Sequence, residues 1–483
     1  MYTPLVYISF AVDYMISGLN PVMFHLTNLL LHLANILLVF AFIKLLSGKK
    51  ETALITSALF AVHPVMADTV AWISTRSNLL FTLFFLASLV SYLYYLKNNF
   101  CSIFYFASLM LFIFSALSKS AAVVLPFILL IIDYYKQRKF SSKILTEKIP
   151  FFIVAAGAAA ITIYFRTDAS TSQTPFIYSL TDKFFILCYS IIAYFIRLVF
   201  PYNLSAVYSY PEKTNGTLSF EFYAAALILI ILVAAVIRLK NKEIRFGALF
   251  FLTGIIVSQA GFLEDGFAAN RYAYLPYTGL FFIIGNLYSA LKKKITYLIC
   301  ISAFLILSAW LSYNRSSVWK DNITLFNDII DKQQGNAFAY NLRGIAKYNA
   351  KDYSGSVEDY SQAIDVNKKY PGAFYNRAIS NYAMGNFSKS SDDYTKAIEL
   401  NPNSAKSYLG RGIIKMDVLK DYDAATRDYN KALELNPYFP QAYYNRGLVK
   451  LRTEKIMEAC EDFRKVKQLG YPQADELMRR YCN

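Results

Sequence analysis

The chain of 483 residues is 56% hydrophobic and 17% aromatic, and its formal net charge is +16. Such a composition excludes an ordinary soluble globular protein. The basic residues stand largely in short loops between apolar runs, at 44–50, 136–139, 238–245 and 292–294. This is the positive-inside pattern of membrane proteins, and it argues against nucleic acid as a partner.

Eleven apolar segments fill the first two thirds of the chain and predict an all-α bundle of ten or eleven membrane spans, residues 1–318. With the basic loops inside, the last span places the C-terminal part outside, in the periplasm if the protein lies in a bacterial inner membrane. The segment 183–200 breaks the parity, because it is re-entrant or interfacial or because one span is wrong, so the span count stays open. The predicted spans are 21–46, 52–66, 79–96, 101–118, 120–135, 149–165, 183–200, 219–238, 246–262, 273–290 and 295–313.

The first long segment carries polar residues along one face. His25, Asn28 and His32 are spaced i, i+3 and i+7, and His63 adds a further polar residue at the end of the second segment. Polar side chains at membrane depth are costly and usually face the interior of a bundle. No Cys or carboxylate stands at the spacing of a zinc site, so we predict interhelical hydrogen bonds rather than a metal site.

A second polar group stands at an outer membrane boundary, where His63, Asp68 and Arg76 lie within fourteen residues. Arginine forms charge-assisted hydrogen bonds, so this group is suited to the head group of a phosphorylated lipid. Ordinary anchoring at the membrane interface explains the same residues equally well. Both interpretations stay open.

Two further cations face the same side in the predicted topology. Lys119 stands between two apolar segments, and Arg271 belongs to the polar run 264–276. Together with Arg76 they predict a cationic pocket around an anionic, phosphate-bearing substrate. Asp68 and Glu264 are weak candidates for a catalytic acid or base, because no spacing argument selects either.

The last third of the chain repeats with a period of about 34 residues, with copies that start at Ala337, Pro371, Ala405 and Pro440. Each copy has an aromatic residue at its fourth position and Gly or Ala at its eighth. The pattern resembles the tetratricopeptide repeat (TPR), a helical hairpin that stacks into an α-solenoid. We therefore expect a connecting helix at 319–336, four repeats at 337–472 and a cap helix at 473–483.

Two charged columns run through the repeats. One reading is a basic groove for an acidic peptide or a lipid phosphate, and the other is an Arg–Asp pair that joins the two helices of every repeat. The second is favoured because the two columns occur together in all four copies. The columns are Arg343, Arg377, Arg411 and Arg446, followed 16 or 17 residues later by Asp359, Asp393, Asp428 and Asp462.

Cysteine is sparse. Cys101, Cys188 and Cys300 lie in apolar spans, where we expect inert packing. Cys460 and Cys482 flank a turn at Gly470 by similar lengths, so an antiparallel helix pair would bring them level. A disulfide between them is suited to an oxidising compartment such as the periplasm.

Several motifs together resemble the transmembrane-and-TPR proteins, a family of O-mannosyltransferases abbreviated TMTC. The motifs are LFAVHPVMADTVAWISTRSNLLFTLFFLASL, LSKSAAVVLPFILLIIDY, EKIPFFIVAA, FPYNLSAVYSYP and NRYAYLP. The resemblance implies a GT-C-type membrane fold, a polyprenyl-phosphate sugar as donor, a hydroxyl acceptor outside and repeats that hold the acceptor protein. It implies no cofactor. By this resemblance His63, Asp68 and Arg76 match one family block, and Arg271 with Tyr272 matches another in which Asn270 replaces the usual acid.

The family resemblance also implies an acidic pair in a first outer loop, upstream of a Tyr-x-Pro-Leu motif that stands here at Tyr2–Leu5. That acid is the expected base for the acceptor hydroxyl. The chain as written is therefore expected not to transfer sugar, whether its start is set too far downstream or it is a truncated relative. The alternative function is a membrane-anchored TPR scaffold without catalysis. A transporter ranks last because the membrane region shows no internal duplication.

Overall fold

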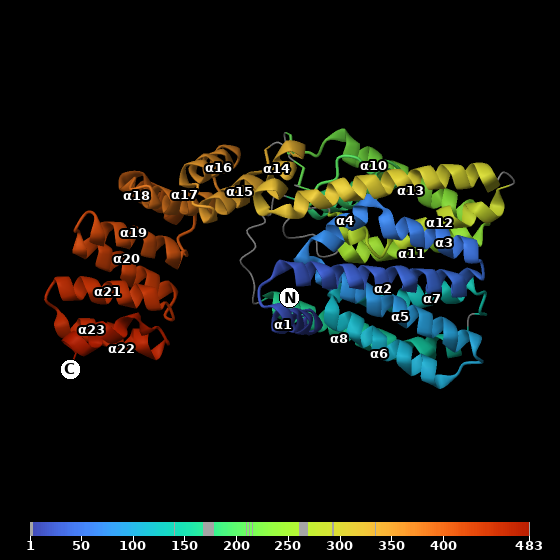
Figure 1. Ribbon diagram of the computed structural model, residues 1–483, viewed down its shortest axis with the longest axis horizontal. Helices are drawn as coiled ribbons and strands as arrows, with labels where there is room; N and C mark the ends of the chain where they lie inside the picture. Colours follow the sequence, from blue (N-terminus) through green and yellow to red (C-terminus); the bar gives the residue numbers. More distant parts are fainter. Residues whose placement is uncertain are drawn as a thin grey trace. The chain divides into compact units, whose positions relative to one another are not determined.

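The computed structural model describes residues 3–139, 141–167, 178–208, 210–211, 213–214, 216–259, 269–291, 294–333 and 335–482. Over these residues the chain is all-α, as expected, with 23 α-helices and no β-strand beyond an isolated bridge between Thr214 and Thr217. The chain divides into two compact units, Met1–Lys320 and Asp321–Asn483 (Figure 1).

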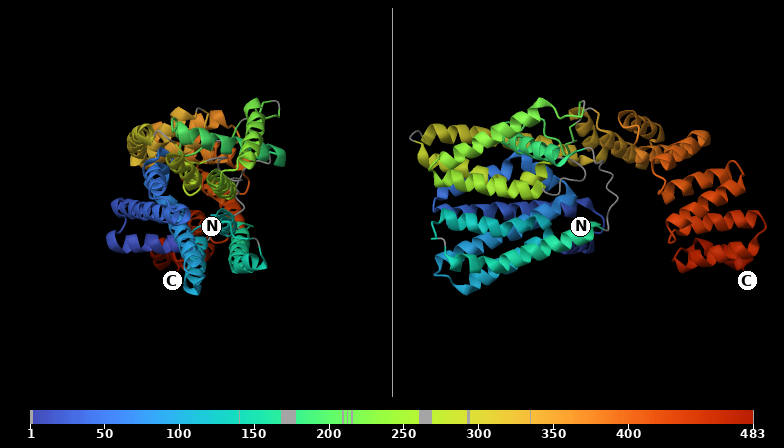
Figure 2. Two further views of the ribbon diagram at one scale, coloured as in Figure 1. Left: turned by 90° about the vertical axis from the view of Figure 1, so that its right-hand side faces the viewer. Right: turned by 180° about the vertical axis from the view of Figure 1, so that it is seen from behind.

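The first unit is a bundle whose long helices run side by side, which Figure 2 shows both from the end and from behind. Its described α-helices are α1 (Pro4–Ser17), α2 (Pro21–Ser47), α3 (Lys50–Val62), α4 (Pro64–Ala71), α5 (Arg76–Lys97), α6 (Ser102–Ser118), α7 (Leu125–Tyr135), α8 (Ser142–Thr167), α9 (Leu180–Val199), α10 (Phe220–Arg238), α11 (Lys242–Gln259), α12 (Tyr277–Ala290) and α13 (Lys294–Ser317). Short 3₁₀ turns join them at η1 (Ile73–Thr75), η2 (Ser120–Val124), η3 (Asn270–Ala273) and η4 (Val318–Lys320).

Among the described residues, five helices are long and apolar enough to cross a membrane, and the bent pair α3–α4 makes a sixth if it counts as one span. These helices fit an integral membrane protein. The number is smaller than the ten or eleven spans that the sequence predicts. The helices α6, α7 and α12 are shorter than 18 residues, and α9 and α11 each carry three charged residues within one membrane length.

Helices α11 and α12 approach so closely that their backbones touch at Gly247 and Gly279. A Cβ atom on either glycine would overlap the carbonyl oxygen of the other. Small residues at such a crossing are typical of helices that associate in membranes, where close backbone packing replaces the hydrophobic effect.

The second unit begins with α14 (Asn322–Lys332) and continues as four helical hairpins in a solenoid, visible in Figure 1. The predicted repeat starts coincide with the first residues of the leading helices. The glycine at the eighth position of three repeats lies under an aromatic ring, as where a Cβ on Gly344 would stand 2.6 Å from Tyr360. The helices are α15 (Ala337–Asn349), α16 (Tyr353–Val366), α17 (Pro371–Ala383), α18 (Phe387–Leu400), α19 (Ala405–Asp417), α20 (Tyr422–Leu435), α21 (Pro440–Arg452), α22 (Ile456–Gln468) and α23 (Asp475–Tyr481), with a 3₁₀ turn η5 (Pro472–Ala474).

The arginine and aspartate columns join the two helices of every hairpin, as the favoured reading expects. In the second repeat Arg377 donates from Nε and Nη2 to both oxygens of Asp393, at 2.9 and 2.7 Å. Its Nη1 donates to Ser361 Oγ of the preceding repeat at 3.0 Å. Arg343 uses its Nη1 in the same way on Asn327 of α14, at 2.8 Å. Helix α14 thus takes the place of a preceding second helix and covers the first repeat.

A disulfide joins Cys460 on α22 to Cys482 after α23, with their Cα atoms 5.5 Å apart. The cap turn packs on α22 around Phe463 and Val466, which are fully buried. The bond closes a stretch of 22 residues, for which chain entropy predicts a stabilisation of about 3 kcal/mol.

Replacing Cys482 by serine is therefore expected to lower the melting temperature of the second unit by roughly 6–10 °C, measured by calorimetry on the full chain. The matched control is Cys101→Ser, since Cys101 is an exposed free thiol. Titration of the chain denatured without a reductant should find three free thiols. Five would show that the bond does not form in solution.

Candidate functional site

One end of the first unit gathers most of the polar residues that the sequence singled out, and a bend in the chain places them there. Helix α3 ends at Val62, and α4 leaves at 57° after the His63–Pro64 break. The ring of His63 caps α4 by accepting a hydrogen bond at Nδ1 from the Val65 amide, at 3.3 Å. Its Nε2 then carries the proton and donates to the Leu198 carbonyl at 3.1 Å. His63 therefore shapes the backbone at this end.

Asp68 lies one turn along α4 and is almost completely buried. Its Oδ1 accepts from Arg315 Nε at 2.8 Å and from Trp319 Nε1 at 2.9 Å, while its Oδ2 accepts from Asn270 Nδ2 at 2.7 Å. The carboxylate thus joins α4, η3 and the end of α13. A carboxylate whose two oxygens accept three hydrogen bonds from separate elements is suited to a clamp that holds those elements together.

Two cations meet on the ring of Tyr272. Lys119 Nζ lies 5.7 Å from the ring centroid, and the Arg271 guanidinium carbon lies 5.1 Å from it. Lys119 also donates to Asn78 Oδ1. Neither cation forms an ion pair with a carboxylate in the part of the chain that the structure describes. Two neighbouring cations that have no carboxylate partner among these described residues are suited to an anion.

Next to the two cations, the rings of Trp72 and Trp319 form an aromatic wall. Arg271 lies over Trp72, with 4.9 Å from the guanidinium carbon to the ring centroid. Trp72 in turn stacks on Trp319 at 5.2 Å between centroids and 29° between planes. Because Trp319 is hydrogen-bonded to Asp68, the clamp fixes the wall on which Arg271 rests.

Lys119 stands in the break between α6 and η2, outside the two apolar helices that it separates. Burial, together with the like charge of Arg271, lowers the pKa of its ammonium to about 7. An anion bound between the two cations would raise this pKa again, so binding and protonation are linked.

Arg76 was expected to share the cationic pocket with Lys119 and Arg271, but its side chain contacts other residues. Its side chain is fully buried and forms an ion pair with Asp13 of α1. Its Nε donates to Asn28 Oδ1 at 2.9 Å, and its Nη2 donates to the Phe24 carbonyl at 2.7 Å. The guanidinium carbon also lies 4.5 Å from the Phe10 ring centroid. With its donors so occupied, Arg76 holds α1 and α2 against α5.

The predicted polar face of α2 divides into buried and exposed parts. Asn28 and His32 are buried, whereas His25, one turn earlier, is exposed. His32 hydrogen-bonds through Nδ1 to the Tyr274 hydroxyl at 2.7 Å and through Nε2 to the Ala61 carbonyl at 3.2 Å. These are interhelical hydrogen bonds of the predicted kind.

Three residues of this end escaped the sequence reasoning. Arg315 and Trp319 stand just before the repeats and Asp13 on the first short helix, each more than 60 residues from its partner. A charged residue in the last turn of the last apolar segment was the available signal for Arg315. Glu264 lies outside the described residues.

Comparison with known families identifies the repeats. One family model, described as tetratricopeptide repeat, matches residues 371–404, and a second, described as TPR repeat, matches residues 419–453. Among solved structures, the crystal structure of MamA covers 32% of this chain and 89% of its own, at 20% identity and a TM-score of 0.29.

The similar curated proteins are protein O-mannosyl-transferases. TMTC3 of Homo sapiens is 22% identical over 77% of this chain and 45% of its own length. A Caenorhabditis elegans protein O-mannosyl-transferase is 26% identical over 76% of this chain and 54% of its own. TMTC2 of Homo sapiens is 40% identical over 19% of this chain and 11% of its own. These matches confirm the resemblance to the TMTC proteins, and the chain spans about half the length of the first two.

Proposed function

We propose that this chain is an integral membrane protein of the GT-C glycosyltransferase type, and that the chain as written binds the donor of this type without transferring its sugar. The reaction of this type takes a hexose from a polyprenyl phosphate and passes it to a protein hydroxyl. The TPR unit binds the acceptor or a partner protein outside the cytoplasm, which is the periplasm in a bacterial inner membrane. The supporting observation is that Lys119 and Arg271 both lie over the ring of Tyr272.

In this reaction the acceptor oxygen attacks the anomeric carbon, and the bond from that carbon to the phosphate oxygen breaks. The polyprenyl phosphate leaves with the electron pair, and a base takes the hydroxyl proton. Lys119 and Arg271 would stabilise the charge that develops on the departing phosphate. Metal and cofactor play no part in this proposal.

A scaffold without catalysis is the second candidate, and the carboxylates at this end favour it. Asp13 and Asp68 are both engaged in buried ion pairs, so both carboxylates serve to hold helices together. The two functions differ in a measurable way, because a scaffold would not bind the donor.

The test uses the full chain in nanodiscs with fluorescent polyprenyl-phosphate mannose. Lys119→Gln and Arg271→Gln should each weaken donor binding by roughly tenfold to a hundredfold, the usual effect of losing one charged hydrogen bond. Lys240→Gln, at an exposed lysine far along the chain, is the control and should bind normally. If Lys119→Gln and Arg271→Gln both bind the donor as tightly as the unchanged chain, the proposed site is wrong. If the unchanged chain does not bind the donor, the scaffold function is supported.

Donor binding should also depend on pH through Lys119. The ammonium is charged below its pKa of about 7, so affinity is highest on the acid side and falls as pH rises through 7. We expect binding at pH 8 to be roughly tenfold weaker than at pH 6. Lys119→Arg should remove this dependence, since a guanidinium keeps its charge. An unchanged pH profile in that variant would show that another group titrates.

A further inference from the structure

The second TPR repeat lacks a lysine that the other three possess. In the first, third and fourth repeats a lysine four residues after the arginine binds the aspartate of the second helix. The distances from lysine Nζ to the aspartate Oδ2 are 3.0 Å for Lys347–Asp359, 2.8 Å for Lys415–Asp428 and 3.1 Å for Lys450–Asp462. In the second repeat this position is Asn381, whose amide donates to Asp393 Oδ2 at 3.2 Å. The hydrogen bond is kept, but the positive charge and the long side chain are lost.

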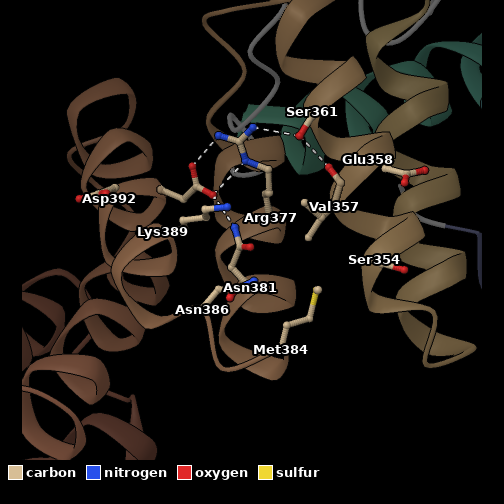
Figure 3. Close-up of a pocket in the computed structure, with 11 residues that line it drawn as sticks. Ser354, Val357, Glu358, Ser361, Arg377, Asn381, Met384, Asn386, Lys389 and Asp392 are labelled. Atoms are coloured by element: carbon tan, nitrogen blue, oxygen red, sulfur yellow. Dashed lines mark hydrogen bonds and ion pairs between the residues drawn. The ribbon is translucent and has the colours of Figure 1, made fainter.

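A cavity of about 530 Å³ opens beside Asn381, between α16, α17 and α18 (Figure 3). This volume lies in the range of pockets that enclose a small ligand, so a side chain with part of its backbone fits. Val357 and Met384 line it with apolar surface, and Asp393 lies at its edge, held by Arg377. The cavity thus offers a wall for methylene groups and a carboxylate for a charged end.

Two further acids make this cavity different from the corresponding places in the next repeats. Glu358 on α16 and Asp392 on α18 both line it, and each directly precedes the aspartate of its own repeat. In the third repeat the residue that corresponds to Asp392 is Arg427. In the fourth repeat the residue that corresponds to Glu358, on the second helix of the preceding repeat, is the same Arg427. Lys389 also lines the cavity, but it forms no ion pair with the residues that the structure describes.

The charges that line the cavity therefore sum to one net negative charge. Arg377 and Lys389 are positive, whereas Glu358, Asp392 and Asp393 are negative. The same scaffold accommodates an ammonium group at the equivalent aspartate in three neighbouring repeats, which shows that the geometry accepts one. The attraction between the buried carboxylate of Asp393 and a further cation is stronger than between the same charges in bulk water, because the effective dielectric constant is lower.

We propose that this cavity binds the side chain of a lysine from a partner protein, whose ammonium takes the place that Lys347, Lys415 and Lys450 fill in the other repeats. The methylene stem lies against Val357 and Met384, and the charged end reaches Asp393 between Glu358 and Asp392. This deepens the proposed protein-binding role of the second unit and does not depend on sugar transfer by the first.

The test measures binding of fluorescent nonapeptides to the full chain by anisotropy. The peptides share one sequence of small neutral residues flanking a central lysine, N-acetyl-lysine or norleucine. We expect the lysine peptide to bind at least tenfold more tightly than the norleucine and acetylated peptides, and the difference to shrink at high salt. Equal binding of the three would overturn the proposal.

Two variants make the test specific to this cavity. Asn381→Lys restores the pattern of the other repeats, so the unit should stay folded while the preference for lysine disappears. The matched control Lys415→Asn makes the same kind of change in the third repeat, next to Arg427, and should leave binding unchanged. Lys389→Ala should strengthen binding by removing a competing charge. A lysine preference that survives Asn381→Lys would place the ligand elsewhere, whatever the outcome of the donor-binding test.

Discussion

Replacing Asp68 by alanine is expected to destabilise the first unit by about 3–5 kcal/mol, because the change breaks the buried ion pair between Asp68 and Arg315. The side chains of Arg315 and Asp68 are only 5% and 4% exposed, so water cannot replace the lost partner. The Trp319 and Asn270 donors lose their acceptor at the same time. The loss should appear as a large fall in the melting temperature of the purified protein in detergent.

Two further variants separate a clamp from a catalytic base at this position. Trp319→Phe removes one hydrogen bond and keeps the ring stack on Trp72, so it should cost only about 1–3 kcal/mol. Asp68→Asn keeps the shape of the side chain but removes the negative charge that forms the ion pair with Arg315. If Asp68 is a base, Asp68→Asn should abolish transfer at an unchanged melting temperature. If Asp68 is the clamp, the melting temperature should fall as well.

The repeat unit was predictable almost to the residue because its information is local. The spacing of aromatic and small residues set the four repeat starts, which coincide with the first residues of α15, α17, α19 and α21. The arginine and aspartate columns lie 16 or 17 residues apart, within one hairpin, so their pairing followed from the pattern alone. The exception is Asn381. Its departure from the lysine pattern can be interpreted only once the structure shows the cavity that it lines.

The membrane end was less predictable because its partners are far apart in the chain. Lys119 and Arg271 were expected to share a site, and the structure places both on Tyr272. Composition cannot distinguish a cation that faces a substrate from one that holds helices together. In the sequence Arg76 is as suitable a phosphate ligand as Arg271. In the structure it pairs with the carboxylate of Asp13, 63 residues upstream. Only the bundle geometry reveals which arginine has a carboxylate partner among the described residues, as Arg76 has in Asp13.

Breaking the Asp13–Arg76 pair is the second change with a large expected effect. Arg76→Ala leaves Asp13 buried and unpaired, and Asp13→Ala does the same to Arg76, so each should cost about 3–5 kcal/mol of unfolding free energy. The double variant Asp13→Leu with Arg76→Met removes both charges and should recover much of that loss, because apolar side chains of similar volume replace a buried pair at little cost. Recovery should be incomplete, since Asn28 and the Phe24 carbonyl then lose their donor.

The measurement is a double-mutant cycle of melting or denaturant unfolding in one detergent, with Arg76→Lys as the conservative control. Lysine keeps the charge but not the fork that reaches Asp13, Asn28 and Phe24 together, so its loss should be intermediate. A strongly non-additive cycle would establish that the pair, rather than either residue alone, docks α1 and α2 on α5. Additive losses would contradict this and would return Arg76 to the candidate ligands of the donor phosphate. In that case Arg76→Lys should weaken donor binding and leave the melting temperature nearly unchanged.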